Sequence, residues 1–128
     1  MSFLKNIFGS SNEEVSTPKM DWILLKDIGQ LNEIVVASES KPVLIFKHST
    51  RCSISRMALK QFENEFNFSE LITPYYLDLL NYRDISNQIA TKFNVMHQSP
   101  QIVLIKNGVC IYSETHENID AKLLASKI

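Results

Sequence analysis

An apolar run that ends in a polar, cysteine-containing loop constrains this chain more than any other feature. Residues 42–46 read Pro-Val-Leu-Ile-Phe, a continuous run typical of a strand that is buried on both faces. The loop Lys-His-Ser-Thr-Arg-Cys follows at residues 47–52, and apolar residues then recur at helical spacing from Ile54 to Phe62. The pattern predicts a short loop between a buried strand and a helix, with Cys52 at the junction.

The start of a helix favours the ionised form of a cysteine. The first N–H groups of a helix have no partner within it, and the positive end of its dipole lies there. The thiolate is the form that this field stabilises, and it is also the nucleophilic form of the side chain. Ser55 lies three residues after Cys52, on the same face of the first helical turn. We expect its hydroxyl to donate a hydrogen bond to the thiolate, with Cys52 as the catalytic nucleophile and Ser55 as its support.

Around this junction the chain alternates strand and helix patterns. We expect further strands near residues 22–25, 73–79, 101–106 and 109–114, and helices near residues 28–37, 53–67, 85–93 and 117–128. Asp27 and Asp84 are the expected caps of two of these helices. The pair Asn107-Gly108 is a strong hairpin signal. The order βαβαβαββα is that of an α/β domain with a central mixed sheet and helices on both faces, because parallel strands need helical crossovers.

Composition excludes several classes of protein. The chain has 128 residues, enough for one domain with a real core, and is 45% hydrophobic and 21% charged. Its formal net charge of −1 argues against the basic stripe of a nucleic-acid binder. No apolar run approaches the roughly 20 residues of a membrane span. We therefore expect neither nucleic acid nor a membrane among its partners.

Residues 1–19 are polar and rich in turn formers, so we expect a flexible N-terminal extension followed by one domain over residues 20–128. The apolar stretch near Met1 is too short for a secretory signal. Two cysteines at unlike sites form no disulfide framework, and the three histidines show no zinc-site spacing. These features favour a cytoplasmic protein without a bound metal.

A Cys-x-x-Ser motif alone is a weak signal, but its surroundings resemble a known family. A Ser-Pro-Gln triplet at residues 99–101 precedes another buried strand, with Pro100 48 residues after the cysteine, and this combination resembles the thioredoxin fold. The chain from Trp22 to Ile128 resembles the YtxJ-like monothiol bacilliredoxins of the thioredoxin superfamily. The residues that carry this resemblance are Phe46 to Thr50, Cys52, Ile54, Ser55, Ala58, Leu59, Val95, His97, Ser99 to Gln101, Thr115, His116 and Ile119. One departure is Ser53, because the family usually has proline directly after the cysteine.

The resemblance implies a thioredoxin-like fold and thiol–disulfide exchange with bacillithiol. The implied reaction removes bacillithiol from S-bacillithiolated proteins through a mixed disulfide on Cys52. The implied partners are S-thiolated client proteins and a low-molecular-weight thiol, with bacillithiol as co-substrate and no tightly bound cofactor. In this fold a cis proline, here Pro100, faces the cysteine and exposes the backbone of Ser99 to the substrate.

The loop around the cysteine supplies further candidate substrate-binding residues, namely Thr50, Arg51 and Ser53. Arg51 is either a solvated loop charge or a functional residue that supports the thiolate or attracts an anionic thiol. His48 is more simply a packed or hydrogen-bonded residue than an acid or base. His97 is expected to shape the loop before Pro100.

The hairpin fixes the roles of residues near the C-terminus. With Asn107-Gly108 as a two-residue turn, Ile105 pairs with Cys110, about five strand residues from Pro100 and on the order of 16 Å away. A disulfide needs Cα atoms within roughly 7 Å, so Cys110 is not expected to resolve a disulfide on Cys52. The same pairing returns Thr115 and His116 to the end of the sheet where Pro100 lies, as candidate rim residues of the site.

Two other functions remain open. A glutathione-dependent or iron–sulfur monothiol glutaredoxin also has one cysteine followed by serine, but it usually shows Cys-Gly-Phe-Ser and a paired glycine near the C-terminus. This chain has only Gly9, Gly29 and Gly108. The other alternative is a thioredoxin-fold interaction module with an idle thiol.

Overall fold

One five-stranded mixed sheet organises the protein. The computed structural model describes residues 20–128, so the extension expected over residues 1–19 lies outside the described residues. The strands are β1 (Ile23–Leu24), β2 (Val43–His48), β3 (Thr73–Asp78), β4 (Gln101–Lys106) and β5 (Val109–Thr115). The helices are α1 (Gln30–Ala37), α2 (Ser53–Glu65) and α3 (Arg83–Lys92), followed by the 3₁₀ segments η1 (His116–Asn118) and η2 (Ala121–Lys127). The predicted α/β class and mixed sheet are confirmed.

The apolar run identified first in the sequence forms the central strand. The strand order is β1-β3-β2-β4-β5, and β2 runs parallel to β3 and antiparallel to β4. All six residues of β2 are buried. A strand in this position is covered on both faces, which is why Val43 to Phe46 are apolar without alternation.

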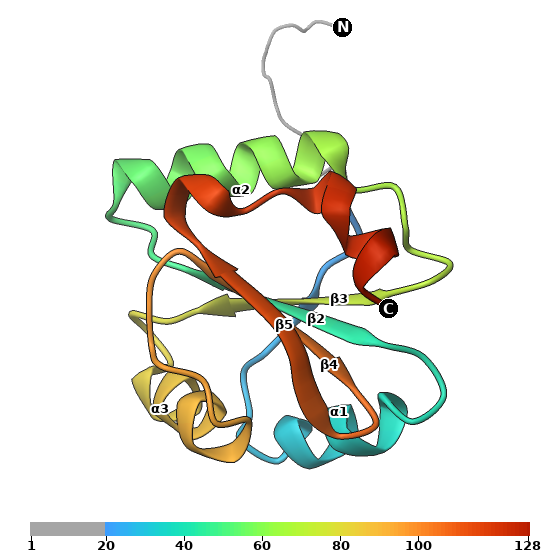
Figure 1. Ribbon diagram of the computed structural model, residues 1–128. Coiled ribbons are helices and arrows are strands. Elements are labelled where there is room, and N and C mark those ends of the chain that lie inside the picture. Colours follow the sequence, from blue (N-terminus) through green and yellow to red (C-terminus); the bar gives the residue numbers. More distant parts are fainter. Residues whose placement is uncertain (1–19) are drawn as a thin grey trace, which may run out of the picture.

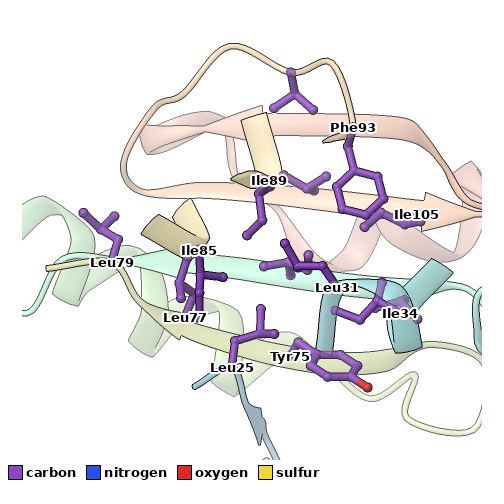
Figure 2. Packing of buried hydrophobic residues seen from close by; sticks show 14 residues of the cluster. Leu25, Leu31, Ile34, Tyr75, Leu77, Leu79, Ile85, Ile89, Phe93 and Ile105 are labelled. Carbon is purple, nitrogen blue, oxygen red and sulfur yellow. The ribbon is translucent and has the colours of Figure 1, made fainter. Parts of the chain in front are cut away.

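Helical segments cover both faces of the sheet (Figure 1). On one face α1 and α3 pack through Leu31, Ile34, Ile85 and Ile89 against strand residues such as Ile105, as Figure 2 shows. On the other face α2 and the C-terminal segment form a second layer. Its main members are Leu44, Phe46, Phe62, Phe66, Ile72, Ile102, Leu104, Ile119 and Leu124. Successive residues of β2 therefore point into different layers.

Several helix ends differ from those expected from the sequence. The closing helix expected over residues 117–128 is instead η1 and η2, because Ile119 and Asp120 between them have extended backbone angles. Asp84 is not a cap: α3 begins at Arg83, which places Asp84 inside the first turn. Asp27 is not the N-cap of α1 either, although its Oδ1 accepts a hydrogen bond from the Gly29 N–H at 2.7 Å in the preceding turn.

None of the helices within residues 20–128 is long and apolar enough to cross a membrane.

The aromatic cluster under α2 allows a direct test of this packing. Phe62 is 1% exposed, and its ring centroid lies 5.4 Å from those of Phe46 and Phe66. Phe62→Ala removes these contacts and leaves a cavity, so we expect a loss of about 3–5 kcal/mol in the free energy of unfolding. Met57 lies on the same helix but is 72% exposed, so Met57→Ala should change that value by less than about 0.5 kcal/mol. Urea denaturation of both variants measures the difference, and equal losses would contradict the assignment of faces.

Candidate active site

Cys52 occupies the N-cap position of α2. Its backbone is extended, with φ −107° and ψ 123°, and its carbonyl accepts the first helical hydrogen bond from the Arg56 N–H at 3.0 Å. The Cys52 N–H donates to the Ser49 carbonyl at 3.2 Å, which closes the loop after β2. The side chain is half-buried. Cys52 therefore lies at the positive end of the helix dipole, as the sequence predicted, and the residue is not fully buried.

Three predicted substrate-binding residues surround the sulfur in sequence and are exposed: Thr50, Arg51 and Ser53. Ser53 is the first helical residue, the position that the family usually fills with proline. The Arg56 guanidinium donates to the Thr50 carbonyl at 3.2 Å and so links the loop to the helix that follows it. These residues form the outer surface of the loop around Cys52.

The register of the sheet brings Pro100 to the same edge. Lys47 lies opposite Gln101, so Pro100 stands at the end of β2 from which the Cys52 loop departs. Pro100 is buried and the Ser99–Pro100 peptide bond is cis. The hydroxyl oxygen of Ser99 is buried and has no hydrogen-bond partner among the described residues.

Thr115 and His116 complete this edge. Gln101 pairs with Thr115, and the His116 N–H donates to the Pro100 carbonyl at 3.1 Å. Their predicted return to the Pro100 end is confirmed. A bulge between Leu104 and Ile105 shifts the pairing by one residue relative to a regular hairpin.

Cys110 lies away from this edge. It pairs with Ile105, as predicted, four strand residues beyond Gln101 and hence roughly 13 Å along the strand. Burial is the largest effect and raises the pKa of its thiol, while a backbone hydrogen bond with Tyr112 lowers it. Its position supports a structural role in β5.

The Ser55 hydroxyl has a different partner from the one predicted. Ser55 is fully buried, and its Oγ lies 2.7 Å from Nδ1 of His48 and accepts from the Ser49 N–H at 3.0 Å. In the part of the chain that the structure describes, no hydrogen bond joins Ser55 to Cys52. The prediction from the sequence missed this pair because it considered only Cys52, three residues earlier, as a partner for Ser55. The alternation of β2 held the missing signal, since His48 shares its face with Phe46, toward α2.

The buried environment of His48 favours the neutral form of its ring. Burial is the largest effect and lowers its pKa; Asp78 raises it, Arg56 lowers it, and the hydrogen bond with Ser55 raises it. The net effect is a pKa for His48 below the usual value of 6.5. The ring lies between those of Phe46 and Tyr76, with centroid distances of 6.4 and 5.7 Å.

A second pair lies on the opposite face, under the loop that leads to Pro100. Lys47 is fully buried, and its Nζ donates to Nδ1 of His97 at 2.7 Å. Ser86 of α3 lies 3.3 Å from the same nitrogen. Desolvation, Lys47 and Arg83 all lower the pKa of His97, which keeps that nitrogen free to accept. His97 therefore holds the loop before Pro100, the role that the sequence indicated.

A groove lies between α2 and the segment that follows β5. It is lined by Ile54, Met57, Ala58, Gln61, His116, Glu117 and Ile119. The groove joins the first turn of α2 to the rim residue His116. Within residues 20–128, no group of three or more His, Cys, Asp and Glu side chains is placed to hold a metal ion.

A buried strand, a loop with a cysteine at the N-cap of the next helix, and a cis proline at the same edge of the sheet define a thioredoxin-fold protein of the thiol redox class. Residues 23–124 match the family model described as monothiol bacilliredoxin BrxC, and the chain belongs to that family.

Solved structures agree with the fold. A structure described as a candidate oxidoreductase with a thioredoxin fold has 36% identity and a TM-score of 0.70, over 82% of this chain and 91% of its own. Thioredoxin Mala s 13 of Malassezia sympodialis has 20% identity and a TM-score of 0.63, over 90% and 94% of the two chains. Thioredoxin O2 of Arabidopsis thaliana has 22% identity and a TM-score of 0.59, over 82% and 89%. The last two similarities concern the fold alone.

The buried Lys47 makes stability depend on pH. Burial lowers its pKa from 10.5 to about 8, so between these values the unfolded chain binds more protons than the folded one and stability rises with pH. We expect the free energy of unfolding of the wild type to gain about 2 kcal/mol between about pH 7 and 9.5, relative to Lys47→Met.

Urea denaturation at both pH values measures this gain. Lys60→Met, an exposed site on α2, should keep the pH dependence of the wild type. If the free energy of unfolding changes with pH equally in wild type and Lys47→Met, the folded protein does not desolvate the Lys47 ammonium group.

Proposed function

We propose that this protein is a monothiol thiol–disulfide oxidoreductase that removes bacillithiol from S-bacillithiolated proteins. The observation that carries the proposal is the half-buried Cys52 at the N-cap of α2, in a chain of the bacilliredoxin family. The helix N-terminus favours the thiolate, which is the species that attacks a disulfide.

The reaction is an exchange with no net oxidation. The Cys52 thiolate attacks the bacillithiol sulfur of a client mixed disulfide, and an S–S bond forms between Cys52 and bacillithiol. The client S–S bond breaks, its electron pair leaves with the client sulfur, and that thiolate takes a proton from solvent. A second low-molecular-weight thiol then attacks the Cys52 adduct, releases the bacillithiol in a new disulfide and regenerates the Cys52 thiolate.

The edge of the sheet around Cys52 supplies the binding groups. The backbone of Ser99 beside Pro100 offers hydrogen bonds to an extended client segment. Arg51 supplies positive charge for an anionic thiol. Thr115 and His116 form the rim on the other side, where the His116 N–H holds the Pro100 carbonyl.

The regenerating thiol comes from outside the chain. Cys110 lies at the far end of the β4–β5 hairpin, and burial raises the pKa of its thiol. Both facts disfavour attack by Cys110 on an adduct at Cys52, because a disulfide requires Cα atoms within roughly 7 Å.

Mass spectrometry after incubation with oxidised bacillithiol tests the proposal. We expect one adduct, located on Cys52, and its removal by an added thiol. Cys52→Ser should abolish both the adduct and release of bacillithiol from a client protein. The matched variant Cys110→Ser should retain most of the activity.

An unmodified Cys52 in folded protein would overturn the proposal and favour an idle thiol in an interaction module. Equal loss of activity in both variants would contradict the placement of Cys110 and a regenerating thiol from outside the chain.

A further inference from the structure

The Ser55 hydroxyl has a single hydrogen to donate, and more than one nearby group can accept it. A serine hydroxyl donates one hydrogen and can accept two. The Ser49 N–H already donates to Oγ at 3.0 Å, which uses one acceptor position. The remaining contact, 2.7 Å to Nδ1 of His48, is made in one of two ways.

The position of the imidazole hydrogen decides between these two ways. A neutral imidazole carries its hydrogen on either Nδ1 or Nε2. With the hydrogen on Nε2, Ser55 must donate to Nδ1 and has no hydrogen left for another group. With the hydrogen on Nδ1, His48 donates to Oγ, and the hydroxyl hydrogen of Ser55 is free.

The sulfur of Cys52 is the group that this hydrogen can serve. Cys52 is the N-cap residue and Ser55 is the third residue of α2, so their side chains lie on the same face of the first turn. A thiolate accepts hydrogen bonds more strongly than a thiol, because charge-assisted bonds are the stronger class. Once ionised, Cys52 therefore competes with Nδ1 of His48 for the hydroxyl hydrogen of Ser55.

We propose that His48 is a positioning residue for Cys52, which moves its own hydrogen to Nδ1 and so releases the Ser55 hydroxyl to the thiolate. The inference rests on the proposed function in that Cys52 is the reacting group. When Cys52 ionises, its proton leaves to solvent, the Ser55 O–H turns from Nδ1 to the sulfur, and the imidazole hydrogen moves from Nε2 to Nδ1 by exchange with water. No net charge is added to the buried His48.

The surroundings of His48 allow this exchange without protonating the ring. The charged and titratable groups that face it are Asp78 and Tyr76 from β3 and Arg56 from α2. The carboxylate raises its pKa and the guanidinium lowers it, while burial keeps the pKa below the usual value. The lowered pKa favours the two neutral forms of the ring above neutral pH.

Nitrogen-15 NMR of the histidine rings tests the proposal in the full chain. We expect Nδ1 of His48 to shift from the resonance of an unprotonated nitrogen to that of an N–H nitrogen as the pH rises. The midpoint should coincide with the appearance of the thiolate ultraviolet absorbance. Cys52→Ala, studied at the same pH values, should show no such shift.

Ser55→Ala separates the relay from a through-space effect of the sulfur charge. It keeps His48 and Cys52 but removes the shared hydroxyl, so the shift should be lost. A wild-type Nδ1 resonance that does not respond to pH would overturn the proposal, and so would one that responds equally in Cys52→Ala. Retention of the shift in Ser55→Ala would overturn the relay through the hydroxyl. If Ser55→Ala fails to fold, the comparison of wild type with Cys52→Ala still tests whether the tautomer of His48 follows ionisation of Cys52. Neither measurement uses bacillithiol, so failure here is distinct from the absence of an adduct on Cys52.

Discussion

Complete burial of the central strand is the constraint on which the rest of the structure depends. Every residue of β2 is buried, including two polar ones at its end, Lys47 at 0% and His48 at 4% exposure. A buried polar side chain without a partner costs stability, so each of these residues needs a neighbour that can hydrogen-bond to it. Because successive strand residues face opposite layers, the two residues find these partners on different sides of the sheet.

The partners belong to the two segments that build the candidate active site. Lys47 binds His97 in the loop that carries Pro100, and His48 binds Ser55 in the first turn of α2. The end of one strand thereby fixes both the proline side and the cysteine side of the site. A single buried strand thus sets the fold and also orients the residues that surround the sulfur.

The sequence predicted what depends on local pattern. The continuous apolar run identified β2, the Asn107-Gly108 turn placed Cys110 opposite Ile105, and the helical spacing after Cys52 placed it at a helix start. The family resemblance was needed to single out Pro100, because a Ser-Pro pair by itself most often has a trans bond. The partners of Lys47 and Ser55 could not be read from spacing. His97 is 50 residues from Lys47. Cys52 is closer to Ser55 in the sequence than His48 is, so spacing favoured the wrong acceptor.

The preference of Ser55 for His48 shows how this site differs chemically from one with two cysteines. A cysteine at position 55 could form a disulfide with Cys52, and the redox state of the pair would then be set by a covalent bond. A serine has only one hydrogen to place, and both a buried imidazole and a thiolate can accept it. The energy difference between these arrangements is that between two hydrogen bonds, so the charge on the sulfur can reverse the preference. Whether Ser55 supports the thiolate therefore depends on its buried neighbour at the end of β2 as much as on the Cys-x-x-Ser motif itself.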